Sequence, residues 1–125
     1  MNWTSRGSAL RWYAVLIATF FAIRAVTTLV HGASFATPGT GWRSLFQLLA
    51  VALLVTGLLR PEWLRACVTA VGALYATATI LELTHSDDLL GLIPVDMRDR
   101  LVHPLVAVLA LVVLAISRPM PARDI

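Results

Sequence analysis

The stretch FFAIRAVTTLVHG places an arginine inside an otherwise apolar run. On a helix of about 3.6 residues per turn, one stripe of this run carries its polar residues, Arg24, Thr27, Thr28 and His31. A charge in hydrocarbon is costly without a partner, so such a guanidinium pairs with a carboxylate or binds an anion. Glu82 is the acid that lies within or at the edge of another apolar run on the same side. The sequence therefore predicts an intramembrane ion pair between Arg24 and Glu82.

Each of the other apolar runs also has polar residues toward the same side, and they would form a polar cup if all of them face inward. The candidates for this cup are His31, Arg43, Gln47, His85, Asp99 and His103. In one interpretation the ion pair has only a structural role: it joins two helices and fixes their register. In the other, intramembrane charges mark function, and the cup binds an anion, a lipid headgroup or a peptide with Arg24 as its anchor.

Histidines raise the possibility of a haem, since bis-histidine sites are built from facing helices in bundle cores. The three histidines here lie near the outer boundary, where capping and interfacial hydrogen bonds are the simpler use. No Cys/His spacing matches a zinc site, and the single cysteine, Cys67, excludes an intrachain disulfide. We find no nucleophile–base pair and no phosphate loop. The sequence thus predicts no catalytic residues, no metal and no cofactor, and its scattered arginines do not indicate nucleic-acid binding.

The elements that position these residues follow from composition. The 125 residues are 58% hydrophobic and 14% charged, which is more apolar than a soluble domain of this size. Four runs are long enough to span a bilayer, at about residues 10–30, 44–59, 64–83 and 101–117. We expect one integral membrane domain over 1–125, an all-α, four-helix transmembrane bundle. The rival interpretation of the first run as a cleaved signal peptide fits poorly, because the run is long and carries an arginine.

Arginine placement predicts the orientation. One side would hold six arginines, Arg6, Arg11, Arg60, Arg65, Arg118 and Arg123. The other side would hold Arg43, Arg98 and Arg100 together with most of the acids. The six-arginine side is predicted to be cytoplasmic, so the chain would be a multi-pass plasma-membrane protein with both termini inside.

Two pairs of segments resemble each other and indicate an internal repeat. TTLVHG and LELTHS end the first and third runs, and LFQLLAVALLV and LVHPLVAVLAL open the second and fourth. The chain is therefore interpreted as two helical hairpins in a parallel repeat. Residues 86–100 contain an apolar middle too short to cross, and we expect an interfacial or re-entrant piece there.

The segment LLGLIPVDMRDRLVHPLVAVLALVV resembles the closing signature of a family of small actinobacterial membrane proteins, a four-helix domain of unknown function. The positions that carry the resemblance are Gly91, Pro94, Asp96, Asp99 and His103. Where the family has a histidine in the second helix, this chain has Gln47. The resemblance implies a fold and a lineage, and no activity.

Three classes of function remain open from the sequence. The first is a structural, accessory or interaction protein, whose expected partners are the bilayer and either another membrane protein or a second copy. The alternative is a ligand-handling protein, a transporter or sensor that uses the polar cup. A weaker alternative is a haem- or redox-linked membrane protein.

Overall fold

The computed structural model describes residues 8–84, 88–91 and 93–117. Its elements, in chain order, are α1 (Ser8–Val30), α2 (Thr40–Leu59), the short 3-10 helix η1 (Pro61–Trp63), α3 (Leu64–Thr84), β1 (Asp88–Leu89), β2 (Ile93–Pro94) and α4 (Met97–Ile116). The four α-helices are long and apolar enough to cross a membrane. This confirms the prediction of a helical protein with four candidate spans.

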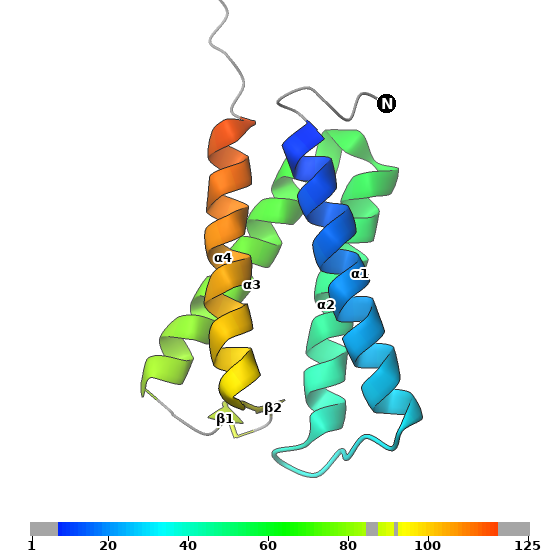
Figure 1. The fold of residues 1–125 in the computed structure, drawn as a ribbon, viewed down its shortest axis with the longest axis vertical. Coiled ribbons are helices and arrows are strands. Elements are labelled where there is room, and N and C mark those ends of the chain that lie inside the picture. The colour runs from blue at the N-terminus through cyan, green and yellow to red at the C-terminus, as the bar shows by residue number, and fades with distance from the viewer. Residues whose placement is uncertain (1–7, 85–87, 92, 118–125) are drawn as a thin grey trace, which may run out of the picture.

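The helices form two neighbouring pairs, α1 with α2 and α3 with α4 (Figure 1). Helix α1 begins and α4 ends at one end of the bundle, which we call the terminal end (Figure 1). The loop after α1 and the strands β1 and β2 lie at the opposite end, which we call the hairpin end (Figure 1). Those polar residues singled out from the sequence that the structure describes belong to the hairpin end.

Apolar side chains occupy both the inside and the outside of the bundle. Phe21, Leu54, Val68 and Val71 are fully buried in the core. The outer faces expose large apolar side chains as well, among them Leu16, Ile23, Leu83, Leu101 and Leu111. A helix that is apolar all round requires an apolar surrounding, so these outer faces are suited to contact with lipid.

Small residues let α3 and α4 approach closely. A Cβ atom on Gly72 would lie only 2.8 Å from the Cβ of Ala110, closer than real Cβ atoms come. Ala76 and Ala107 line the same seam between the two helices. Small side chains spaced in this way are typical of tightly packed membrane helices.

The helix starts differ from the apolar runs. Helix α2 begins at Thr40 and α4 begins at Met97, each four residues before the predicted span. At α4 the cause is a capping box, in which the side chains of Asp96 and Asp99 each accept a hydrogen bond from the other's backbone N–H. Both helices therefore begin within the polar segment that precedes the apolar run.

Within the segment expected to be an interfacial or re-entrant piece, the strands β1 and β2 form a small antiparallel pair. Asp88 pairs with Pro94, and Leu89 pairs with Ile93. Gly91 adopts a positive φ of 71° in the turn, a conformation that glycine reaches without a steric penalty. Leu89 is buried, so the hairpin packs onto the bundle and does not extend away from it.

Candidate functional site: a buried polar network at the hairpin end

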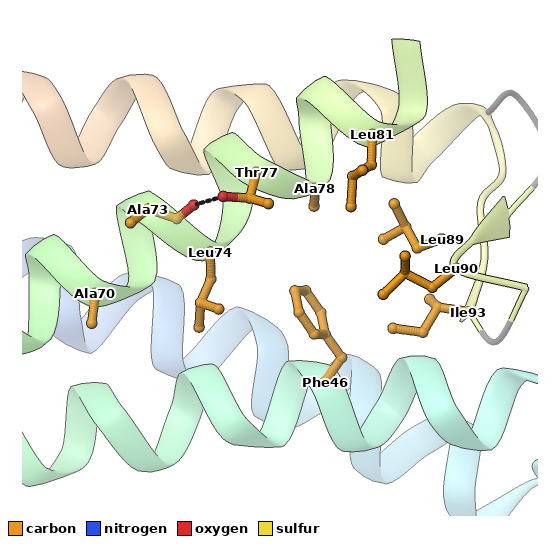
Figure 2. A pocket seen from close by; sticks show the side chains of 10 residues that line it. All are labelled: Phe46, Ala70, Ala73, Leu74, Thr77, Ala78, Leu81, Leu89, Leu90 and Ile93. Atoms are coloured by element: carbon orange, nitrogen blue, oxygen red, sulfur yellow. Dashed lines mark hydrogen bonds between the residues drawn. The ribbon is translucent and has the colours of Figure 1, made fainter. Parts of the chain in front are cut away.

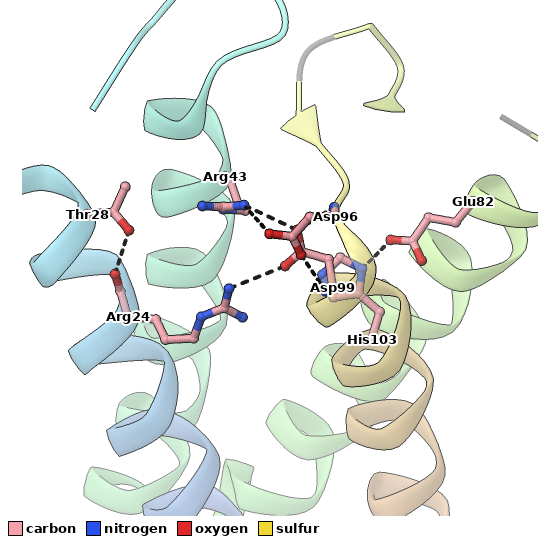
Figure 3. A network of polar contacts seen from close by, with 7 residues as sticks. All are labelled: Arg24, Thr28, Arg43, Glu82, Asp96, Asp99 and His103. Atoms are coloured by element: carbon pink, nitrogen blue, oxygen red, sulfur yellow. Dashed lines mark hydrogen bonds and ion pairs between the residues drawn. The ribbon is translucent and has the colours of Figure 1, made fainter. Parts of the chain in front are cut away.

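Asp99 is the centre of a polar network that joins helices distant in sequence (Figure 3). Its side chain is 0% exposed, and it lies in the first turn of α4. One carboxylate oxygen, Oδ1, is 3.6 Å from Nη2 of Arg24 on α1. The other, Oδ2, accepts a hydrogen bond of 3.3 Å from Nη1 of Arg43 on α2. Asp99 thus holds α1 and α2 against the start of α4.

Arg43 also reaches the rim of the network. Its Nη1 lies 3.6 Å from Oδ2 of Asp96, whose side chain is 47% exposed. The guanidinium therefore bridges a fully buried carboxylate and a half-exposed one. Arg24 lies beside the same group and has its guanidinium carbon 5.7 Å from the ring centre of Phe20, a cation–π contact.

A second buried pair joins α3 to α4. Nδ1 of His103 is in direct contact with Oε1 of Glu82, and both side chains are almost completely buried. Such a contact requires a proton between the two atoms, because two bare acceptors would repel each other. His103 lies one helical turn after Asp99, so α4 presents both of its network residues on one face (Figure 3).

The partner predicted for Arg24 has to be corrected. Arg24 and Glu82 do not pair in the structure: Arg24 lies against Asp99, and Glu82 contacts His103. The physical reason is the early start of α4. The apolar run that marks this span begins at Leu101, so Asp99 lies just before the predicted span, and Glu82 is the acid that the sequence assigns to Arg24. The capping box draws Asp99 into the helix, where it lies closer to Arg24 than the acid on α3 does.

The other residues expected in the cup are placed as follows. Gln47 is buried on α2, one turn after Arg43. His31 follows the end of α1 and is exposed, and its side chain makes no hydrogen bond or ion pair within the described ranges. His85 lies outside the residues that the structure describes. The structure therefore brings Arg43 into contact with Asp99, and it places His103 one turn after Asp99 on α4 and Gln47 one turn after Arg43 on α2.

Aromatic rings surround the network on its inner side. The ring of Tyr75 stacks on Phe21 at a centroid distance of 5.1 Å and at an interplanar angle of 11°. The same ring lies 5.1 Å from the imidazole of His103 and 5.1 Å from Phe46. These rings fix the orientation of His103, because the imidazole cannot rotate without displacing them.

Three further side chains near this depth carry buried polar atoms, and of these only Gln47 is a cup residue expected from the sequence. Ser44 Oγ, Gln47 Oε1 and Tyr75 OH have no hydrogen-bond partner among the described residues. Buried polar atoms of this kind cost free energy, and they keep the interior polar at this depth. Ser44 lies next to Arg43 in the sequence, and its position three residues before Gln47 is the signal that could have identified it.

Asp96 caps α4 outside the spanning helix, and its carboxylate is held in the charged form. Partial burial raises the pKa of Asp96, but the hydrogen bond from the backbone N–H of Asp99 and the charges of Arg43, Arg98 and Arg24 outweigh it, so the pKa is lowered from its ordinary 3.8. The signal that could have identified this cap is an aspartate followed three residues later by an acid, just before an apolar run.

This shift predicts a pH dependence with a definite sign. The folded pKa of Asp96 lies below the unfolded one, so its contribution to stability is full above about pH 4 and is lost as the pH falls through the folded pKa. We expect thermal stability in detergent to decrease below about pH 4, and we expect Asp96→Asn to flatten this decrease. An Asp96→Asn protein whose acid profile matches that of the unaltered chain would contradict the assignment to Asp96.

Two hollows differ in character. A polar hollow of about 360 Å³ lies where α1, the start of α2 and the start of α4 meet, and it contains Arg24, Arg43 and Arg98 in its wall. An apolar hollow of about 530 Å³ lies between α2 and α3 below the hairpin. Figure 2 shows that Phe46, Leu74, Leu89 and Ile93 point into it. The polar hollow is suited to a charged group, and the apolar hollow is suited to an apolar group.

Within the described ranges no group of three or more histidine, cysteine, aspartate or glutamate residues is placed to hold a metal ion. Compared with family models, curated proteins and solved structures, the chain matches none of them.

Proposed function

We propose that the chain is a small integral protein of the plasma membrane with a structural or accessory role, neither an enzyme nor a nucleic-acid-binding protein. One observation carries this proposal: each of the four helices contributes a charged side chain to the network at the hairpin end. Arg24, Arg43, Glu82 and Asp99 come from α1, α2, α3 and α4 in turn. Charges used in this way fix the relative positions of the helices.

The core beneath the network also favours a structural role over a transport pathway. Phe21, Leu54, Val71 and Val106 are buried there with at most 2% exposure. Among the residues that the structure describes, packed apolar side chains of this kind leave no polar route toward the terminal end. A transporter would need polar groups or water along its path.

The proposed orientation places the terminal end in the cytoplasm and the network toward the outside. It is supported by the arginines near the terminal end, among them Arg11, Arg60 and Arg65. We also propose that the two helix pairs, α1–α2 and α3–α4, are parallel repeats. Membership of the actinobacterial family remains a proposal as well, based on the signature that includes Gly91, Pro94 and His103.

An accessory protein acts within a complex, and the test is therefore the mass of the native assembly. We expect native mass spectrometry of the protein, gently extracted from its own membrane, to show a second polypeptide or a second copy in fixed stoichiometry. A membrane complex of known composition, extracted in parallel, controls for dissociation. A bare monomer in a preparation that keeps the control complex intact would contradict the accessory role.

A further inference from the structure

We propose that the polar hollow at the hairpin end binds a phosphate group, and that this group belongs to an anionic membrane phospholipid. This goes beyond the structural role proposed above. The hollow measures about 360 Å³, and its polar wall consists of Arg24, Arg43, Arg98, Thr27, Thr28 and Asp96. Three guanidinium groups around one hollow are suited to a phosphate, because their planar N–H groups match its oxygens in pairs.

The charges in the wall do not cancel. Three arginines face two carboxylates, Asp96 and Asp99, which leaves one positive charge in excess. Arg98 carries that excess: its charge acts on Asp96, but it makes no ion pair within 4.0 Å in the described part of the chain, whereas Arg24 and Arg43 both contact Asp99. An anion in the hollow would compensate it, and the low polarity of the surroundings would strengthen the attraction.

The two inner arginines are held in place and still have donors to offer. The carboxylate contacts engage Nη2 of Arg24 and Nη1 of Arg43, at 3.6 Å and 3.3 Å from Asp99. A guanidinium has five N–H donors, so most of those on each arginine remain for a ligand. Because Asp99 already fixes both groups, binding would cost little side-chain ordering.

The apolar surroundings identify the source of the phosphate as a lipid. Ile23 forms part of the wall of the same hollow and is largely exposed on α1. Farther along the seam between α1 and α4 lies an apolar hollow of about 290 Å³ with Leu16, Ile17 and Leu109 in its wall. A phospholipid would place its phosphate among the arginines and its acyl chains along this seam. A free phosphate would use only the polar part.

Arg98→Gln is the variant that tests the site with the network left intact. The matched control is Arg100→Gln, which removes the same charge two residues farther along α4, on a different face of the helix and outside the hollow. The delipidated protein in mild detergent is titrated with phosphatidylglycerol, and bound lipid is counted by native mass spectrometry. We expect Arg98→Gln to weaken binding about tenfold, the size of one charge-assisted contact, and Arg100→Gln to change it less than twofold.

Two further binding measurements distinguish an anionic phospholipid from a zwitterionic lipid and from free phosphate. Phosphatidylcholine, which has the same phosphate and no net charge, should bind more weakly than phosphatidylglycerol. Millimolar inorganic phosphate should not displace phosphatidylglycerol. Displacement by inorganic phosphate would make the ligand a soluble anion and overturn the lipid assignment. Equal losses in the two arginine variants, no loss in Arg98→Gln, or equal binding of both lipids would overturn the site.

Discussion

Replacing Asp99 with asparagine is expected to lower the free energy of unfolding by about 3 kcal/mol, one of the two largest effects we predict for this chain. The substitution keeps the size of the side chain and a hydrogen-bond acceptor, but removes the charge that faces Arg24 and Arg43. Two guanidinium groups would then lie close together without their buried counter-ion. The measurement is unfolding in mixed detergent micelles, followed by circular dichroism.

Asp96→Asn is the matched control for this experiment. It removes the same charge three residues away, at a side chain that is 47% exposed and contacts Arg43 at 3.6 Å. Solvent and salt screen such a pair, so the loss should be well below that of Asp99→Asn. In addition, Arg24→Gln should cost less in the Asp99→Asn background than in the unaltered chain, because the two residues interact. Similar losses for both aspartates would contradict the central role of Asp99.

The second large effect concerns the buried pair between α3 and α4. Glu82→Leu is expected to destabilise the protein by about 2–4 kcal/mol, because it leaves the imidazole of His103 buried without its partner. The double variant Glu82→Leu/His103→Leu should recover much of this loss, since removing both polar partners is far less costly than removing one. The measurement is a double-mutant cycle in the same unfolding assay.

Glu62→Leu provides the control for the loss of a carboxylate. Glu62 lies in η1 at the terminal end, and its contact with Arg60 is a solvent-exposed pair at 3.9 Å. We expect its removal to change stability by less than about 0.5 kcal/mol. If the Glu82 and His103 losses simply add in the double variant, the two side chains do not act as a pair, and the contact seen in the structure carries no coupling energy.

Together these effects explain why a protein of this kind tolerates charges in its helices. The network joins Arg24 on α1, Arg43 on α2 and Asp99 on α4, while Glu82 and His103 join α3 to α4. Apolar packing alone gives weak discrimination between helix registers, because lipid is as apolar as the side chains. Pairs that are satisfied in only one arrangement add that discrimination. Arg98, which is not part of these pairs, is the residue that remains for a ligand.

The capping box at the start of α4 decides which acid pairs with Arg24. The apolar run places the last span from Leu101, so the sequence predicts Asp99 as a residue of the polar cup just before the span and does not predict it as the partner of Arg24. The capping box between Asp96 and Asp99 extends the helix to Met97 and buries the second aspartate. Glu82 was the remaining acid in a span, so the sequence assigned it to Arg24. In the structure, Glu82 contacts His103 instead.

The sequence by itself determined the four apolar helices and the gathering of polar residues toward one end of them. Both are local properties: length and hydropathy decide a span, and the spacing of Asp99 and His103 or of Arg43 and Gln47 decides a shared helix face. Only the tertiary structure decided which carboxylate meets which cation, and that three arginines surround one hollow. Those contacts depend on the rotation and the axial offset of each helix against its neighbours, and a shift of one turn, about 5.4 Å, exchanges the partners.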